Sequence, residues 1–257
     1  MLTIDKFKYK IHILYIMDLF EAIKTRRSAK KYLDRKVPDD LIGAVIEAGG
    51  MAPSAGNKQN WKFVVVRDKE KRDQISKFCK DQYWMADAPV HIVMCSDDSV
   101  SKRLFGERGE YLSIQNCALA AENILLTSVD FGLGACFVSA IDESEIANLL
   151  GVPGSARVQS VITLGYPATK EMSKKTLKPI KEIMNIEAYG SDGKDLSAFL
   201  FDWSTVIKNQ ISGLTDDLVG IMRNELKDVS KDTTKSLEKT SKKVRDYLEK
   251  RFTKREF

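Results

Sequence analysis

The chain has 257 residues, 43% of them hydrophobic, so it can bury a full-sized core as one large domain or one domain with an appendage. Its 41 basic and 36 acidic residues are intermixed and leave a net charge of +5. This balance gives no strong field of one sign and disfavours a dedicated nucleic-acid binder. No apolar run is long enough to span a bilayer, so no transmembrane segment is expected.

Residues 1–16 are expected to be an N-terminal extension. They contain a short apolar stretch that is followed at once by Asp18 and Glu21 and by no small-residue cleavage site. Met17 is a plausible natural start. Residues 1–16 then form either an upstream start-site extension or a short strand packed on the body.

Apolar spacing and chain-breaking residues predict alternating helices and strands between residues 17 and 190. The predicted helices span residues 17–26, 38–48, 69–78, 113–129 and 143–149. The predicted strands span residues 63–66, 90–95, 135–138 and 159–164. A polar loop at 52–61 connects the second helix to the first strand. This order predicts an α+β or α/β domain that ends near Gly190.

Few side chains of the chain suit nucleophilic or metal chemistry. Four cysteines form no C-x-x-C pair and have spacings that suit neither a zinc site nor a disulfide scaffold: Cys79, Cys95, Cys117 and Cys136. Reduced thiols in a cytoplasmic protein fit best. Two histidines, His12 and His91, leave little for a Ser/His/Asp or Cys/His system. We expect His91 to be a strand residue with a hydrogen-bonded ring. A cofactor is therefore expected to supply any chemistry.

The composition changes after residue 190. Residues 203–222 are moderately apolar, whereas 224–257 are rich in lysine, glutamate, serine and threonine around a sparse apolar stripe. We expect a helical C-terminal extension over 191–257 made of one or two long amphipathic helices. Thr233 and Thr240 stand at core heptad positions and disfavour a strong coiled coil. The extension lies along the body or a partner subunit, or it binds a separate partner or a membrane surface.

A basic cluster follows the first predicted helix. The segment Arg26-Arg27-Ser28-x-Lys30 brings together two guanidinium groups, a hydroxyl and an ammonium. Guanidinium groups grip phosphate oxygens with parallel charge-assisted hydrogen bonds, so the cluster suits a phosphate monoester. Alternatively, it is a basic turn that complements the dipole of the preceding helix.

A second polar segment runs from Pro53 to Trp61 and includes Ser54, Asn57 and Gln59. Side-chain amides both donate and accept hydrogen bonds, which is what recognition of a flavin pyrimidine or a nucleobase-like ring requires. Alternatively, these polar groups satisfy the backbone of their own loop.

Four motifs in sequence order give residues 17–187 a resemblance to the FMN-dependent nitroreductase family. The basic cluster is similar to the family's R-R-S-x-R phosphate element, with Lys30 at the last position. The polar loop resembles P-S-x-x-N-x-Q-P-W, with Asn60 where proline is usual. The helix before Gly132-Leu133-Gly134 is similar to the family's long central helix, with Asn116 where aspartate is common. Residues 161–167 resemble the strand that ends in G-Y-P, and a basic patch follows them.

The resemblance implies an α+β fold with a mixed central sheet flanked by helices, and a homodimer with two FMN sites at the subunit interface. By matching, the residues that hold the phosphate and ribityl chain would be Arg26, Arg27, Ser28 and Lys30. The residues that contact the flavin from the partner subunit would be Pro53, Ser54, Asn57 and Gln59. Backbone groups near the reactive N5 edge would be those of Ser139 and Ala140. Lys175 and Lys178 would close over the phosphate, unless they form a solvated charge run.

The implied activity is that of a cytoplasmic NAD(P)H-dependent FMN oxidoreductase. In a ping-pong reaction, NADH or NADPH would reduce the flavin, which would then reduce an acceptor such as a nitroaromatic or a quinone. No catalytic side chain and no metal are expected. Four aromatic residues either wall the acceptor pocket or, for at least two of them, belong to the core: Tyr83, Trp84, Phe105 and Tyr111.

Two other functions stay open. One is a flavin enzyme of the same fold with other chemistry, such as dehalogenation or another redox reaction. The other is a non-enzymatic scaffold whose basic helical tail binds a partner or an anionic surface.

Overall fold

The computed structural model describes residues 19–169 and 175–191. The chain divides into two units, Met1–Leu177 and Lys178–Phe257. The predictions for residues 1–16 and for the tail from residue 192 onward lie outside the described residues. Among the helices that are described, none is both long and apolar enough to cross a membrane.

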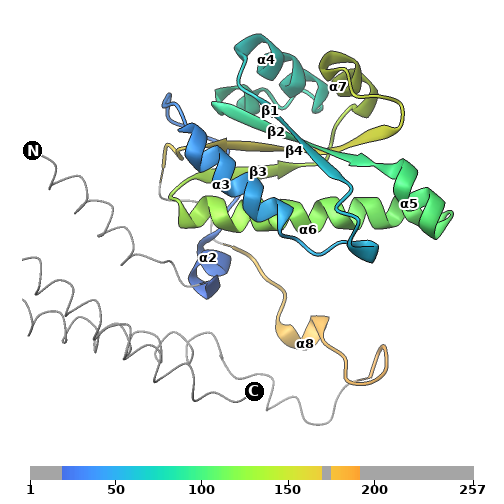
Figure 1. Cartoon of the computed structure of the whole chain (residues 1–257). Helices are drawn as coiled ribbons and strands as arrows, with labels where there is room; N and C mark the ends of the chain where they lie inside the picture. Colours follow the sequence, from blue (N-terminus) through green and yellow to red (C-terminus); the bar gives the residue numbers. More distant parts are fainter. Residues whose placement is uncertain (1–18, 170–174, 192–257) are drawn as a thin grey trace, which may run out of the picture. The chain divides into compact units, whose positions relative to one another are not determined.

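A four-stranded sheet forms the centre of the first unit (Figure 1). Its strands are β1 (Trp61–Val66), β2 (Val90–Asp97), β3 (Gly134–Val138) and β4 (Ala156–Gly165). They lie in the order β1-β2-β4-β3, and every neighbouring pair is antiparallel. A parallel pairing enters as an isolated bridge between Ser28 and Ala135. The sequence predicts a mixed sheet. In the structure the four named strands are all antiparallel, and among the described residues the bridge between Ser28 and Ala135 is the parallel pairing.

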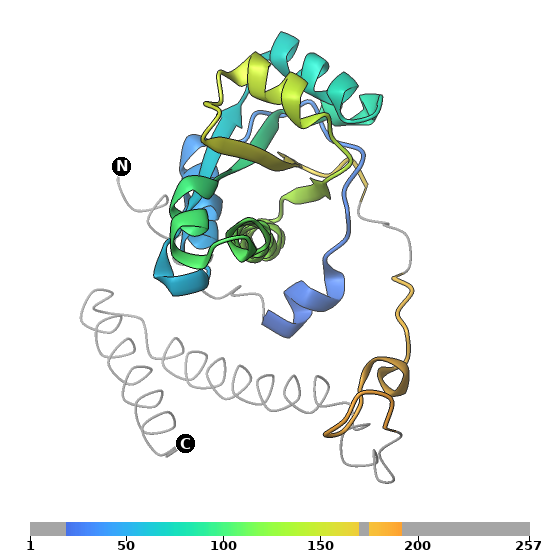
Figure 2. The same ribbon diagram turned by 90° about the vertical axis from the view of Figure 1, so that its right-hand side faces the viewer.

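Helices cover both faces of the sheet. One face packs on α3 (Asp39–Gly50) and α6 (Arg108–Asp130), and the other on α4 (Lys69–Phe78) and α7 (Glu143–Leu150). Figure 2 looks along α6 and shows α4 and α7 on the opposite side of the strands. The predicted α+β class and its flanking helices are confirmed.

The apolar run in β2 supplies both cores. Ile92 and Met94 belong to the cluster with α3 and α6, whereas Val93 and Cys95 belong to the cluster with α4 and α7. Successive side chains of a strand point to opposite faces, so a strand that is covered on both faces is mostly apolar on both, with His91 as the buried polar residue within 90–95. This is why residues 90–95 show no alternation.

His91 is a strand residue with a hydrogen-bonded ring, as the sequence predicts. The His91 side chain is fully buried in β2, and its Nε2 atom is 2.8 Å from the carbonyl oxygen of Met85. Burial lowers the pKa of His91 to about 4. All four cysteines are buried and unpaired, and burial raises the pKa of Cys79 and Cys117 to about 12.

Several shorter helices complete the described elements. The first unit also contains α2 (Leu19–Thr25), η1 (Ala55–Asn57), η2 (Tyr83–Asp87) and α5 (Asp98–Phe105). The second unit contains α8 (Ile180–Ile183). Helix α5 has no counterpart among the predicted elements, because its buried residues are the polar Asp98 and Ser101 and give no apolar period.

Candidate functional site

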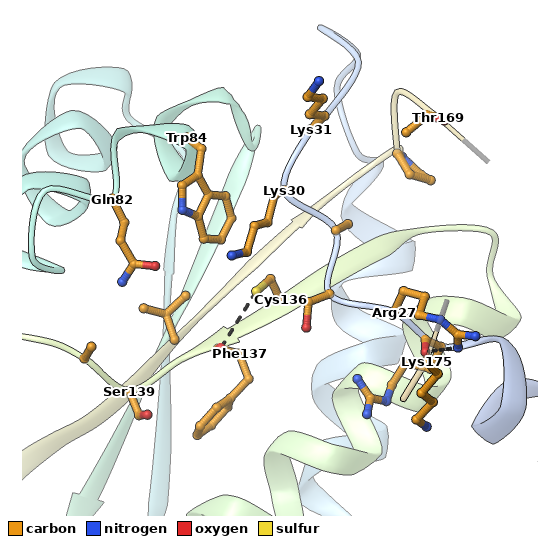
Figure 3. Close-up of a pocket in the computed structure, with 16 residues that line it drawn as sticks. Arg27, Lys30, Lys31, Gln82, Trp84, Cys136, Phe137, Ser139, Thr169 and Lys175 are labelled. Carbon is orange, nitrogen blue, oxygen red and sulfur yellow. Dashed lines mark hydrogen bonds between the residues drawn. The ribbon is translucent and has the colours of Figure 1, made fainter. Parts of the chain in front are cut away.

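A hollow of about 800 Å³ opens beside β3 in the first unit (Figure 3). It lies among segment 26–31, the end of β3 and residues of η2. Its lining holds five basic side chains and no carboxylate: Arg26, Arg27, Lys30, Lys31 and Lys175. The volume suits a cofactor-sized ligand, and the charge favours an anion.

The basic segment lies along the edge strand of the sheet. The backbone N–H of Ala29 donates to the carbonyl oxygen of Ala135 at 3.1 Å. A Cβ atom at Gly134 would lie only 2.7 Å from the Ala29 Cβ, so this close approach requires glycine. The Tyr32 hydroxyl donates to the Ala29 carbonyl oxygen at 2.7 Å and lies 2.7 Å from Thr163 Oγ1. These contacts fix the basic residues against β3 and β4.

Arg27 and Lys175 lie together at one end of the hollow (Figure 3). Arg27 donates to the carbonyl oxygen of Lys24 at 2.6 Å, and Lys175 Nζ donates to that of Ile23 at 3.3 Å. Both carbonyls belong to the last turn of α2, so the basic cluster also caps this helix. Arg26 makes a salt bridge with Glu122, with Nε 3.5 Å from Oε1. The phosphate-binding and helix-capping interpretations are thus compatible.

Lys30 lies beside Trp84, away from Arg27 and Lys175 (Figure 3). Its Nζ atom is 5.4 Å from the centroid of the Trp84 ring, within the range of a cation–π interaction. Gln82 lines the same region, and its amide donates to the Cys79 carbonyl oxygen at 2.8 Å.

The four aromatic residues of the predicted acceptor wall separate in the structure. Trp84 lines the hollow and is half-buried against the core cluster of α4 and α7. Tyr83 and Tyr111 are 62% and 66% exposed, and Phe105 is half-buried. The interpretation that at least two of them belong to the core is wrong.

The floor of the hollow comes from β3 and the turn after it. Ser139 and Ala140 line it together with Cys136 and Phe137, and their role beside a flavin stays a prediction. Burial raises the pKa of the Cys136 thiol, and the hydrogen bond with Ser28 and the nearby cations only partly offset this rise. The thiol is therefore neutral at physiological pH, and the Phe137 side chain offers a partly exposed apolar surface.

The polar loop does not line this hollow. Its predicted site residues are Pro53, Ser54, Asn57 and Gln59. The loop contacts α6 where the Ala55 N–H donates to Asn116 Oδ1 at 2.9 Å, whereas the basic segment contacts α6 at Glu122. Six residues of a helix advance about 9 Å and turn the facing side by about 120°. One chain therefore brings the loop and the basic cluster to different faces of α6.

The loop backbone holds an uncommon conformation. Gly56, Asn57 and Gln59 have positive φ angles of 56°, 55° and 47°. The Gln59 N–H donates to Ser54 Oγ at 2.9 Å, and the Gln59 amide donates to Asn57 Oδ1 at the same distance. The Ser54 hydroxyl thus satisfies a backbone group of its own loop, whereas the Asn57 and Gln59 amides bond to each other.

Two of the three departures from the family's motifs, Asn60 and Asn116, contact each other. Asn116 Nδ2 donates to Asn60 Oδ1 at 2.8 Å, and the two side chains are 2% and 5% exposed. The two N–H groups of Asn60 Nδ2 in turn face three acceptors, the Asp97 carbonyl oxygen, Ser101 Oγ and Ser113 Oγ, at 3.0, 3.2 and 2.8 Å. This buried network joins the end of the loop to α5 and α6.

Of the remaining predicted site residues, two line the hollow. Ser28 and Lys30 line the hollow together with the two arginines. Lys178 belongs to the second unit, so its role stays a prediction. Sequence analysis missed Lys31, Gln82 and Thr169, which also line the hollow. Lys31 directly follows the basic motif, whereas nothing in the sequence marks Gln82 or Thr169.

Comparison with known proteins identifies the fold and the family. The model of the nitroreductase family matches residues 23–84 and 79–166. A relative from Methanothermobacter thermautotrophicus, named as an NADH dehydrogenase/NAD(P)H nitroreductase, is 38% identical over 173 residues, 65% of this chain and 87% of the relative.

Two solved structures extend the comparison. One, named as an NADH dehydrogenase/NAD(P)H nitroreductase from Bacteroides thetaiotaomicron, is 30% identical with a TM-score of 0.58 and covers 66% of this chain and 98% of its own. The other, an FMN-dependent nitroreductase from Clostridium difficile, is 26% identical with a TM-score of 0.56 and covers 65% and 98%.

The fold and the relatives define the class of NAD(P)H-dependent flavin oxidoreductases. Within that class, the chain belongs to the nitroreductase family. The predicted family, fold class and enzyme class are confirmed.

Proposed function

We propose that the basic hollow binds FMN and that the protein transfers electrons from NADH or NADPH through this flavin to a small acceptor. The observation that carries the proposal is the lining itself, five basic side chains and no carboxylate around about 800 Å³. A dianionic phosphate and a planar ring fit a site that is cationic and floored by Phe137 (Figure 3).

Different residues of the hollow contact the phosphate and the ring of the proposed FMN. Arg26, Arg27 and Lys175 hold the phosphate with charge-assisted hydrogen bonds, and Ser28 adds a hydroxyl. Ser139 and Ala140 present backbone groups to the ring from the turn after β3. Bound FMN would supply the hydride chemistry, so no side chain has to act as nucleophile or base. This agrees with a neutral Cys136 and a fully buried His91.

The donor and the acceptor are proposed to occupy the site one after the other, as a ping-pong reaction requires. A nitroaromatic or a quinone is the acceptor class we propose, in line with the nitroreductase names of the relatives. A flavin enzyme with different chemistry would bind FMN equally well, but its flavin would not be reduced by NADH or NADPH.

A second copy of the chain is proposed to complete each site as a homodimer. Pro53, Ser54, Asn57 and Gln59 do not line the hollow of their own chain, and in the proposed dimer a partner subunit brings them to it. Exposed apolar side chains on α5 and α6 offer a surface for that partner: Leu104, Tyr111, Ile114 and Leu119.

The cytoplasm is the compartment we propose, because the four thiols are unpaired. The scaffold alternative depends on the basic tail, which lies outside the described residues.

Titration of the apoprotein with FMN and with riboflavin tests the proposed site. Riboflavin lacks the phosphate but keeps the ring and the ribityl chain. Because two charge-assisted hydrogen bonds are each worth about 1.5–3 kcal/mol, we expect FMN to bind at least about a hundredfold more tightly. Equal affinity for the two flavins would contradict a phosphate site at Arg26, Arg27 and Lys175.

A further inference from the structure

We propose that Trp84 is a positioning residue that holds the Lys30 ammonium beside the ring of the bound flavin and thereby sets the flavin's midpoint potential. The inference rests on the proposed function, since it requires FMN in the basic hollow. It concerns a contact between two side chains of this chain, which the structure shows without any ligand.

The packing of Trp84 makes it a firm support. The residue belongs to η2, and part of its indole packs on the core cluster beneath α4 and α7. The rest of the ring faces the hollow, where the Lys30 ammonium lies 5.4 Å from its centroid (Figure 3). The negative face of an aromatic ring attracts a cation at this distance.

Lys30 needs such a support, because its side chain is exposed. Among the described residues, no carboxylate forms a salt bridge with Lys30. A free lysine side chain loses about 2 kcal/mol of rotamer entropy when it is fixed in one position. The contact with Trp84 offsets part of this cost and keeps the charge inside the hollow.

Lys30 lies apart from Arg27 and Lys175 (Figure 3), so we assign it a different role from these two cations. Arg27 and Lys175 gather at the opposite end of the hollow, where a phosphate satisfies them (Figure 3). The ammonium of Lys30 is then left for the ring, whose pyrimidine part carries carbonyl oxygens and gains negative charge on reduction. A fixed positive charge nearby stabilises the reduced ring more than the oxidised ring, so it raises the midpoint potential.

Four variants and one control test the proposal in the FMN-loaded protein: Trp84→Leu, Trp84→Phe, Lys30→Met, the double variant W84L/K30M, and Tyr83→Leu. Tyr83 is the matched control, because it is the neighbouring aromatic residue, is 62% exposed and does not line the hollow. The measurements are the FMN dissociation constant and the midpoint potential of the bound flavin.

We expect Trp84→Leu to lower the midpoint potential and to weaken FMN binding about two- to fivefold, the range of an exposed cation–π contact. Trp84→Phe keeps an aromatic face and should shift the potential less. In the Lys30→Met background the Trp84→Leu change should have no further effect on the potential. Tyr83→Leu should match the wild type.

The outcomes separate the two proposals. A wild-type protein that binds no FMN would refute the proposed function itself. FMN binding with an unchanged potential in Trp84→Leu, or an equal shift with and without Lys30, would overturn only the role of Trp84. If Trp84→Leu does not fold, Lys30→Met decides the question, because an unchanged midpoint potential in that variant would overturn the role of the Lys30 charge and with it that of Trp84.

Discussion

Replacing Asn116 by aspartate changes one atom in the network that anchors the polar loop. The Asn116 amide donates from Nδ2 to Asn60 Oδ1 at 2.8 Å and accepts at Oδ1 from the Ala55 N–H at 2.9 Å. Aspartate keeps the second bond, but its other oxygen faces Asn60 Oδ1 with no proton between them. The Asn60 amide has no favourable flip, because a flip would turn Oδ1 toward the Asp97 carbonyl oxygen, which accepts a hydrogen bond from Nδ2 and has no proton to donate.

The structure gives the size of the effect. The variant loses one hydrogen bond, worth about 1 kcal/mol, and leaves a buried acceptor unsatisfied, which costs about 1–3 kcal/mol. Asn116→Asp should therefore lower the free energy of unfolding by about 2–4 kcal/mol at neutral pH. A protonated carboxyl group at position 116 can again donate to Asn60 Oδ1, and burial disfavours its charged form. Both effects raise the pKa of this carboxyl group in the folded variant. The loss should be smallest below about pH 4 and should grow as the pH rises toward that raised pKa.

Urea denaturation at neutral and acidic pH measures this loss, and Gln115→Glu is the control. Gln115 precedes Asn116 on α6, is exposed, and undergoes the same amide-to-carboxylate change. It should alter the free energy of unfolding by less than about 0.5 kcal/mol. If Asn116→Asp is also within this margin at neutral pH, the Asn60–Asn116 network does not anchor the loop.

Three further predictions concern the hollow and the core. Gly134→Ala places a Cβ 2.7 Å from that of Ala29, so it should cost about 1–3 kcal/mol of stability and weaken FMN binding, while Gly154→Ala, which meets nothing within 4 Å, should do neither. Lys175→Gln should weaken FMN about tenfold and leave riboflavin affinity unchanged in the same titration. His91 is neutral in the fold, with its pKa lowered to about 4 from 6.5, so the unfolded chain binds the proton first as the pH falls. Wild-type stability should thus decrease by about 3 kcal/mol between pH 6.5 and 4, and His91→Gln should lack this part of the decrease in urea denaturation.

The regular elements could be predicted because their signals are local. Apolar spacing and flanking glycines place α4, α7 and all four strands within a few residues of the structure. Helix α5 could not be predicted, because its buried face is polar and is satisfied by tertiary contacts such as the Asn60–Ser101 hydrogen bond.

The candidate site could be predicted only in part, because its residues come from separate parts of the chain. The motif at 26–30 carries several cations together, so local chemistry was enough to mark it. The sequence predicts Trp84 only as an aromatic residue of either the pocket wall or the core. Its contact with Lys30 depends on how η2 packs. The link between Asn60 and Asn116 joins positions 56 residues apart in the sequence, and no local pattern indicates it.

Anaerobic addition of NADH and then NADPH to the FMN-loaded protein tests the central claim most directly. The visible absorption of the bound flavin should bleach with at least one donor and return when a nitroaromatic or a quinone is added. A protein that binds FMN but is reduced by neither nicotinamide would contradict the proposed reaction, and a protein that binds no FMN would contradict the proposed site.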